Sequence, residues 1–168
     1  MKANQNLEEA VMRRLDRKIE SMEDILGVLG HCQVCRLALA SPEGMPYVVP
    51  LNFGYAYKAG QLHFYMHCAK EGQKLDMIRA NPFVCFEADN AGALISGPRA
   101  CNYSQKYESV IAFGKAEILN DPDAKEKGLE YIMQHQSGKD KWQFDSVALS
   151  RVEVICVQVD SVTGKRHL

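Results

Sequence analysis

The stretch MPYVVPLNFGYAYKAGQLHFYMH, from Met45 to His67, carries the clearest indication of the fold. Its residues alternate with a period of two, as in a β-strand, where neighbouring side chains point to opposite faces. One face carries Tyr47, Val49, Leu51, Phe53, Tyr55 and Tyr57. The other face carries Val48, Pro50, Asn52, Gly54 and Ala56, nearly all of them small. Lys58-Ala59-Gly60 is typical of a hairpin turn, so we expect a second strand from Gln61 to His67.

The same period recurs along the rest of the chain, between three helical segments. Further strands are predicted at residues 34–39, 83–88, 107–119 and 148–159, with a glycine-rich loop from residue 89 through Gly97-Pro98. Gly114 interrupts the third of these strands, which indicates a bulge or a close backbone approach. Helices are predicted from residue 22 to near Gly30, around Leu75 and Ile78 until just before Asn81-Pro82, and at 121–136. The first and last have the N-cap residues Ser21 and Asp121. Long strands joined by hairpins favour a mainly β (α+β) fold, built as an antiparallel barrel.

The composition indicates one ordinary globular domain. The chain has 168 residues, 46% of them hydrophobic and 24% charged, and its net charge is -1. This balance argues against a general nucleic-acid binder, which usually shows a strongly basic face. The apolar runs are too short for a membrane-spanning helix, and the start of the chain is too charged for a secretory signal. We therefore expect a charged N-terminal arm at residues 1–20, a single domain at 21–168, and a cytoplasmic location.

Two groups of cysteine and histidine residues are candidates for metal or redox chemistry. HCQVC, from His31 to Cys35, contains a C-x-x-C motif, but a structural zinc site needs four ligands and no second pair follows. His63 and His67 share a strand face, yet they lie about 13 Å apart along an extended strand and cannot bind one metal ion together. We therefore predict no metal site, and we interpret the six cysteines as free thiols, several of them in the core.

The junction FYMHCAKEGQKLDMI, from Phe64 to Ile78, is a candidate anion site. Here a strand passes into a helix, and the first turn of a helix leaves N–H groups free to bind an anion. Lys70 and Lys74 are spaced to share one helical face, and Gly72 allows a ligand to approach the backbone. The spacing fits a phosphate clamp and a solvated helix with a Glu71–Lys74 surface pair equally well.

The small face of the preceding strand favours the first of these interpretations. Pro50, Asn52 and Gly54 leave room for a flat ring against the backbone, and Pro50 cannot donate to a strand ladder. A flat heteroaromatic ring with a phosphate tail would use both features. Flavin mononucleotide (FMN) fits that description, and haem or a nucleotide fits it less well.

Five segments together resemble a known family. CRLALA, PYVVPLNFGY, FYMHCAKEGQKLDMI, NPFVCFEAD and ESVIAFGKAEI occur in this order. They resemble the flavin-binding split-barrel proteins related to pyridoxamine 5'-phosphate oxidase, and most of all the nitroimidazole-resistance (Nim-type) branch. The resemblance runs from about Arg13 to the C-terminus. It implies a six-stranded antiparallel split β-barrel with flanking helices, and a homodimer with FMN at the subunit interface.

The resemblance also implies which residues bind the cofactor. They are Val49, Pro50, Leu51 and Asn52 beside the ring, Tyr65, Met66 and His67 at the next strand end, Lys70 and Lys74 at the phosphate, and Ser109 reaching the cofactor from the neighbouring subunit. His67 matches a histidine associated with nitro-compound reduction, so it is the expected catalytic residue. AKE, from Ala69 to Glu71, replaces the SRK-like phosphate motif of the oxidase, which speaks against oxidation of pyridoxamine phosphate.

Sequence and resemblance together predict an FMN-dependent oxidoreductase that reduces nitro compounds such as 5-nitroimidazoles. No nicotinamide-binding fingerprint is visible, so the sequence does not indicate the electron donor. The alternatives are a non-catalytic flavin- or haem-binding split barrel, in which His67 is a steric wall or an axial ligand, and a metal- or redox-active protein built on His31, Cys32 and Cys35.

Overall fold

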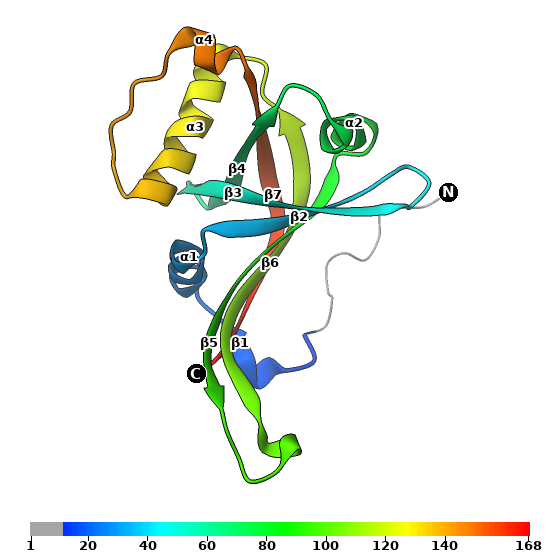
Figure 1. Cartoon of the computed structure of the whole chain (residues 1–168), viewed down its shortest axis with the longest axis vertical. Helices are drawn as coiled ribbons and strands as arrows, with labels where there is room; N and C mark the ends of the chain where they lie inside the picture. The colour runs from blue at the N-terminus through cyan, green and yellow to red at the C-terminus, as the bar shows by residue number, and fades with distance from the viewer. Residues whose placement is uncertain (1–11) are drawn as a thin grey trace.

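The structure, a computed structural model, describes residues 12–168. Its elements, in chain order, are η1 (Leu15–Arg17), β1 (Lys18–Ile19), α1 (Met22–His31), β2 (Val34–Ala40), β3 (Pro46–Lys58), β4 (Gln61–Ala69), α2 (Gln73–Ala80), β5 (Phe83–Ile95), η2 (Ala100–Asn102), β6 (Ser104–Ile118), α3 (Pro122–Ser137), α4 (Ser146–Leu149) and β7 (Val152–His167). Figure 1 shows α3 and α4 at one end of the molecule, α2 at one side and a long projection of strands at the other end.

The strands form one antiparallel sheet that closes on itself. Its order is β1-β7-β4-β3-β2-β5-β6. An additional pairing of β6 with β7 closes the ring and leaves β1 outside it. Strands β2 to β7 therefore form a six-stranded barrel, and β1 is a short addition at the edge of β7. The predicted fold class, a six-stranded antiparallel barrel with flanking helices, is confirmed.

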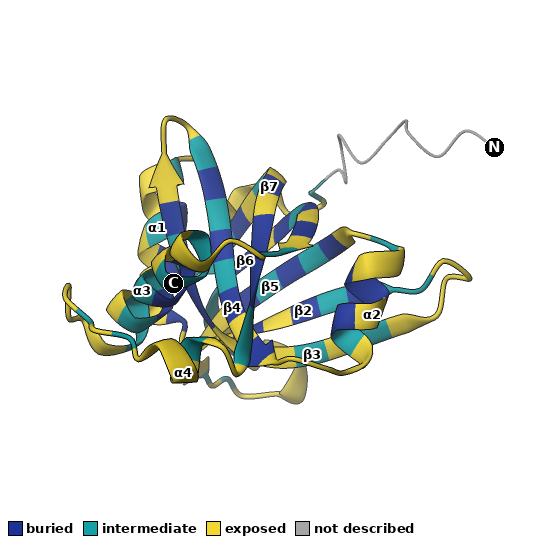
Figure 2. Cartoon of the chain, turned by 90° about the horizontal axis from the view of Figure 1, so that it is seen from above, coloured by how far each residue is buried: buried dark blue, intermediate teal, exposed yellow. Residues whose placement is uncertain are grey.

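Side chains of alternate residues fill the inside of the barrel. Leu62, Phe64 and Met66 of β4 are buried, as the alternation predicts. Phe64 stacks on Phe86 of β5, and Phe53 of β3 meets both rings edge-on. Figure 2 shows buried and exposed residues alternating along the strands. This core fixes the register of β3 and β4, because a shift by one residue would turn every apolar side chain outward.

Helices α1 and α3 begin where the sequence predicts, for the predicted reason. The Ser21 side chain accepts a hydrogen bond from the Asp24 N–H at 3.1 Å, and the Asp121 side chain accepts one from the Ala124 N–H at 2.9 Å. Helix α3 then crosses the outside of β3. A Cβ atom on Gly54 would lie 2.3 Å from the Tyr131 backbone carbonyl, so only glycine permits this close approach.

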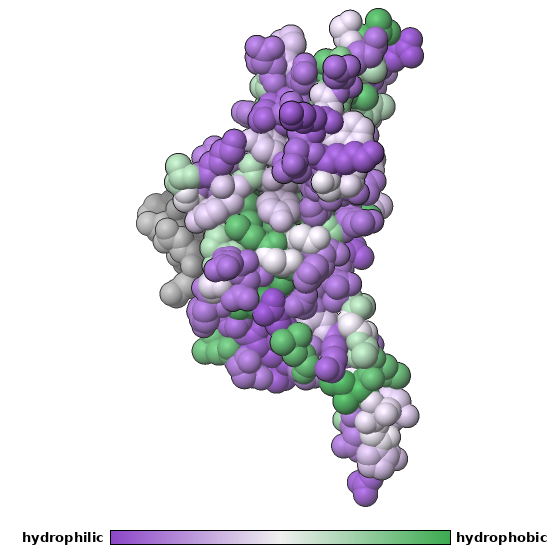
Figure 3. Space-filling view, turned by 90° about the vertical axis from the view of Figure 1, so that its left-hand side faces the viewer, coloured by the Kyte–Doolittle hydropathy of each residue, from purple (hydrophilic) through white to green (hydrophobic). Residues whose placement is uncertain are grey.

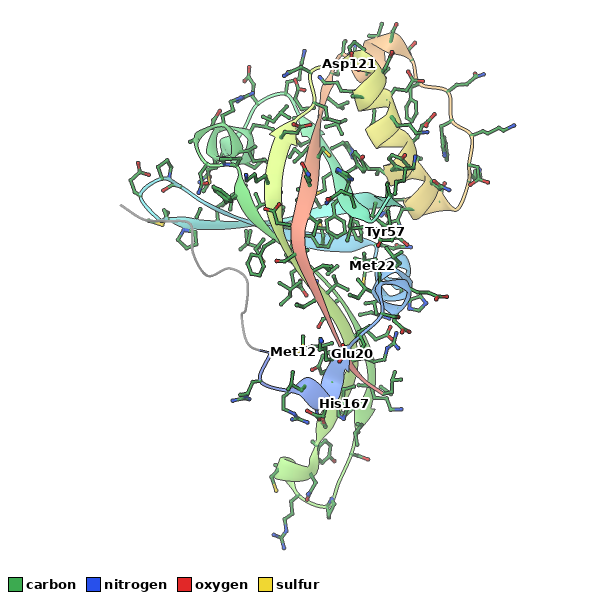
Figure 4. The ribbon with its side chains drawn as sticks, turned by 180° about the vertical axis from the view of Figure 1, so that it is seen from behind. Met12, Glu20, Met22, Tyr57, Asp121 and His167 are labelled. Carbon is green, nitrogen blue, oxygen red and sulfur yellow. The ribbon has the colours of Figure 1, made fainter. Side chains whose placement is uncertain are left out.

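Two strands are longer than the sequence predicts. β5 continues past residue 88 to Ile95, and β7 continues past residue 159 to His167. With β6 they form the projection, which we call the arm (residues 89–113 and 160–167). Figure 4 shows Asp121, at the start of α3, near the top of the molecule and His167, near the end of β7, in its lower half, where the projection continues beyond it. Gly114 lies where the β6–β7 register shifts, so the predicted bulge is confirmed.

The arm lacks the signals that identify strands in a sequence. Its β5 part reads Asp-Asn-Ala-Gly-Ala-Leu-Ile, which contains no alternation of apolar and polar residues. These residues form a strand because they pair with β6, and not because one of their faces is buried. Figure 3 shows apolar side chains at the base of the projection. The large exposed apolar residues of the arm are Leu94, Tyr103 and Ile111.

The remaining predictions on organisation concern the N-terminus and the membrane. The predicted N-terminal arm, residues 1–20, is a different segment, and its residues 1–11 lie outside the described residues. At the end of this N-terminal segment, β1 pairs with β7, and Ile19 is buried. Between residues 12 and 168, none of the helices has the length and apolar character required to cross a membrane.

Candidate functional site

The barrel wall opens where β3 and β4 separate. Their pairing runs from Lys58 and Gln61 to Phe53 and Met66, and it ends there. Beyond this point residues 46–52 of β3 pair only with β2, and residues 67–69 of β4 pair only with β7. We call this opening, bounded by residues 46–52 and 67–69, the fork. In Figure 1, β4 turns toward α2, while the hairpin of β2 and β3 continues across the molecule.

Asn52 and His67 are the first residues on the two sides of the fork. They would form the next pair after Phe53 and Met66, and both of their side chains are exposed. Since residues of a register pair share a face, both side chains lie on the outer face of the barrel. The fork therefore brings an imidazole and a carboxamide to the same place, beside two backbone edges that no strand covers within residues 12–168.

Two other predicted residues of β4 have their side chains occupied elsewhere. Met66 is buried in the core, so only its backbone borders the fork. The ring of Tyr65 stacks on Tyr131 of α3, with 5.0 Å between ring centroids, and burial raises the pKa of Tyr65. Tyr65 therefore holds α3 against the barrel.

The small face of β3 is divided into an open and a covered half. Val48 and Pro50 are exposed, whereas Gly54 and Ala56 are buried, with the α3 backbone against Gly54. The expectation that Gly54 offers room for a ring is therefore wrong, because α3 occupies that room. Although Pro50 cannot donate to a ladder, it does not interrupt the pairing with β2, because the register passes through Pro50 without a shift.

The other face of this half of β3 points into the barrel but is not sealed. Val49 and Leu51 pack against the main core and are only partly buried. Their partners across the ladder, Leu37 and Cys35, are fully buried. The difference arises because β4 has left this side of β3. The fork is thus an opening with apolar walls, flanked by free backbone donors and acceptors.

The predicted phosphate clamp differs from the structure in one respect. Helix α2 begins at Gln73, so Lys74 is in its first turn but Lys70 lies in the preceding loop. The two lysines therefore do not share a helical face. Gly72 has φ of 138°, which favours glycine, and no side chain caps the helix.

Neither of these lysines is paired with a carboxylate. Among the residues that the structure describes, the ion pairs include neither Lys70 nor Lys74, and the Glu71–Lys74 surface pair is not formed. Burial raises the pKa of Cys68, and the positive charge of the nearby Lys74 opposes this shift. Two cations beside an uncapped helix start, directly after residue 69 of β4, are an arrangement that suits an anion.

Sequence reasoning missed Gln136, which lies next to Asn52. Gln136 is near the C-terminal end of α3, and its Nε2 atom donates to the Phe53 carbonyl at 2.9 Å and to the Gln33 carbonyl at 3.0 Å. Asn52 donates to the same Gln33 carbonyl and to Gln136 Oε1, each at 3.1 Å. No motif identifies Gln136, because its role depends on the crossing of α3 over β3.

Ser109 lies far from the fork within one chain. It pairs with Asp89 on β5 and with Lys165 on β7 in the arm, whereas His67 pairs with Val154 on β7. The path from residue 154 to residue 165 of an extended strand is about 36 Å. Val49, Pro50, Leu51, Asn52 and His67 lie in the fork, and Met66 borders it through its backbone. Lys70 lies in the loop that follows and Lys74 in the first turn of α2, whereas Tyr65 lies in the paired part of β4 and Ser109 in the arm.

The cysteines are placed as core residues. All six are free, and Cys32, Cys35, Cys68 and Cys156 are buried. Burial raises the pKa of Cys32 to about 11 and that of Cys35 to about 12, so both are protonated thiols at neutral pH. His31 is exposed and lies 3.4 Å from Glu108. Within residues 12–168, no three His, Cys, Asp or Glu side chains are arranged to hold a metal ion.

A closed barrel with one pair of strands held apart defines a split-barrel protein. Comparison with protein families agrees with this architecture: the model for the pyridoxamine 5'-phosphate oxidase family matches residues 21–166. The chain therefore belongs to this family. No protein with a curated description matches the chain.

Solved structures with this fold include flavin-binding proteins. A candidate 5-nitroimidazole antibiotic resistance protein from Bacteroides thetaiotaomicron is 34% identical, with a TM-score of 0.76, over 89% of this chain and 86% of that chain. An FAD-binding protein from Mesorhizobium loti is 27% identical, with a TM-score of 0.63, over 90% and 98%. A flavocytochrome from Azotobacter vinelandii is 17% identical, with a TM-score of 0.76, over 94% and 72%, and shows the fold alone.

Proposed function

We propose that the protein binds FMN at the fork and reduces small nitro compounds, such as 5-nitroimidazoles. The observation that carries this proposal is the fork itself. It combines an open strand edge, an exposed apolar surface at Val48 and Pro50, and two unpaired lysines in the segment after β4. These features suit, in turn, the polar edge of a flat ring, its face and its phosphate. The similarity to a candidate nitroimidazole-resistance protein supports the choice of acceptor.

The residues of the chain have separate tasks in this proposal. Lys70 and Lys74 neutralise the phosphate, together with the free N–H groups at the start of α2. Val49, Pro50, Leu51 and the backbone of Tyr65 and Met66 position the ring. When bound, FMN supplies the redox chemistry, while the protein contributes orientation and electrostatics.

His67 has the catalytic task, because it is exposed on the outer face of the fork. An imidazole can hold a proton at one ring nitrogen and donate it to an oxygen of the reduced nitro group. The electrons for nitro reduction would come from reduced FMN, which an external reductant would regenerate.

A second copy of the chain completes the proposed site. Ser109 cannot reach the fork of its own chain, since the extended strand β7 separates the two positions. In a homodimer, the arm of one subunit could deliver Ser109 to the fork of the other, and exposed Leu94, Tyr103 and Ile111 would supply apolar contacts. The free cysteines favour a reducing compartment, which supports the cytoplasmic location within the same proposal.

A haem-binding protein is the second candidate. The flavocytochrome supports it through the fold alone, and exposed His67 is then an axial ligand. A visible spectrum separates the two candidates, because haem gives a Soret band, whereas FMN gives a flavin spectrum that bleaches with dithionite.

The decisive experiment compares His67→Ala with His63→Ala in the FMN-loaded protein. His63 is the matched control, since it lies on the same face of β4 but within the paired part of the strand. We expect His67→Ala to lower kcat/KM for 5-nitroimidazole reduction by about 100-fold or more, because a positioned proton donor contributes at least that much. His63→Ala should leave the rate within about twofold of the unchanged protein. Equal rates for the two variants would remove His67 from the mechanism, and a protein that ignores added FMN would overturn the proposed function.

A further inference from the structure

The carboxamide of Asn52 is held in one orientation by its neighbours. Its Nδ2 atom lies 3.1 Å from the Gln33 carbonyl oxygen and 3.1 Å from Gln136 Oε1. A backbone carbonyl only accepts hydrogen bonds, so the Asn52 atom that faces Gln33 must be the nitrogen. The opposite orientation would place two oxygens against each other.

The orientation of Gln136 is fixed independently, by the same rule. Its Nε2 atom lies between the carbonyl oxygens of Gln33 and Phe53, at 3.0 and 2.9 Å, and both of these are acceptors. The Gln136 oxygen is therefore the atom that remains for Asn52. The carbonyl oxygens of Gln33 and Phe53 thus determine which amide atom of Asn52 and Gln136 is the nitrogen. Exchanging oxygen and nitrogen in either side chain would place two acceptors against each other.

This arrangement uses both N–H donors of Asn52 and leaves its Oδ1 atom available as an acceptor. An asparagine has two donors on nitrogen and one acceptor oxygen. Both donors are consumed, while within residues 12–168 no group donates to Oδ1. Asn52 is exposed at the first position of the fork, opposite His67. A ligand at the fork therefore meets an acceptor at this residue and not a donor.

We propose that Asn52 selects a ring N–H of the ligand, and that Gln136 is the positioning residue that turns the Asn52 oxygen toward it. The inference rests on the proposed function, and it assigns a specificity determinant within that site. The oxidised isoalloxazine ring carries one ring N–H, at N3, between two carbonyl groups. The predicted recognition is a hydrogen bond from this N–H to Asn52 Oδ1.

The first test needs no flavin. The side-chain amide of Asn52 is observed by NMR in ¹⁵N-labelled protein without added cofactor, and its signal is assigned with Asn52→Ala. We expect slow solvent exchange of both Asn52 amide protons in the unchanged protein, and rapid exchange in Gln136→Ala. Gln134→Ala is the matched control on the same helix, because Gln134 donates to Asp140 and takes no part in the group. Rapid exchange in the unchanged protein would overturn the fixed orientation.

The second test measures the dissociation constants of FMN and N3-methyl FMN by fluorescence titration. In the unchanged protein the methyl group removes the donor, and we expect binding about tenfold weaker, the loss that one hydrogen bond supplies. In Asn52→Ala the partner is absent, so the difference between the two flavins should fall to about twofold or less. Gln136→Ala should give an intermediate difference, and Gln134→Ala the full one.

The outcomes separate this inference from the proposed function. If the unchanged protein binds neither flavin, the proposed function fails, and the recognition of N3–H fails with it, while the NMR result still decides the amide orientation. If FMN binds but the tenfold difference persists in Asn52→Ala, the proposed function stands and the inference is wrong. Because Asn52 is exposed, Asn52→Ala is expected to fold, and its thermal unfolding is recorded to establish this.

Discussion

The two halves of β3 differ in their strand partner and in whether their small outer face is covered or exposed. Residues 53–58 pair with β4, α3 packs over Gly54, and Ala56 is buried. Residues 46–52 pair with β2 instead, and Val48, Pro50 and Asn52 are exposed. Each half therefore pairs along one edge, but α3 also packs against the backbone of residues 53–58, whereas the small face of residues 46–52 is exposed. A strand can thus anchor a core at one end and leave its backbone and side chains available to a ligand at the other.

The largest expected effect is that of Gly54→Ala in the covered half. A Cβ atom would lie 2.3 Å from the Tyr131 backbone, so α3 must move away from β3. We expect a loss of about 3 kcal/mol in the free energy of unfolding, measured in urea, because overpacking a rigid contact costs about that much. Gly27→Ala is the control, since a Cβ atom at Gly27 meets nothing within 4 Å. Equal stability of the two variants would mean that α3 does not constrain the covered half.

The pH dependence of unfolding tests how much the packing of α3 on residues 53–58 of β3 contributes to stability. His135 of α3 donates from Nε2 to the Cys32 carbonyl at 2.7 Å and packs 4.7 Å from the Phe53 ring, and burial lowers the pKa of His135. Its neutral form is therefore favoured by folding. This contribution is present above the unfolded-state pKa of about 6.5 and is lost as the pH falls toward the folded-state value. In urea unfolding at several pH values, we expect the unchanged protein to lose more stability on acidification than His135→Gln does. Parallel pH profiles would contradict this role.

The smallest effect is expected in the open half, at Pro50. The side chain is exposed, and the register with β2 already passes through this position. Pro50→Ala should change the free energy of unfolding by less than about 1 kcal/mol, mainly through the greater freedom of the unfolded chain. Urea unfolding measures this directly. A loss as large as that of Gly54→Ala would show that the two halves are not energetically distinct.

The barrel was predictable because its strands alternate. Leu62, Phe64 and Met66 have a buried face, and a period of two reveals that face in the sequence. The arm was not predictable, because Ala91, Gly92 and Ala93 are exposed and no core selects their residue types. Pairing with distant strands defines that part of the fold, and pairing leaves no local pattern.

The candidate site was predictable in its strands and not in its contacts. The resemblance identified Asn52 and His67, which the structure places on the two sides of the fork. The position of Lys70 before α2 follows from where the helix begins, and helix boundaries are weakly encoded in sequence. Gln136 is distant in sequence from Asn52 and meets it only because α3 crosses β3.

The pairings of β7 have a consequence for the order of folding. This strand pairs with β4, β6 and β1, and its partner residues reach from Lys18 to Ile118. The ring of strands closes only when β7 is in place, so most of the loop-closure entropy is lost in one late step. We expect folding to be slow for a domain of this size. The β4 side of the fork, which only β7 supports, should become ordered in the same step that completes the barrel.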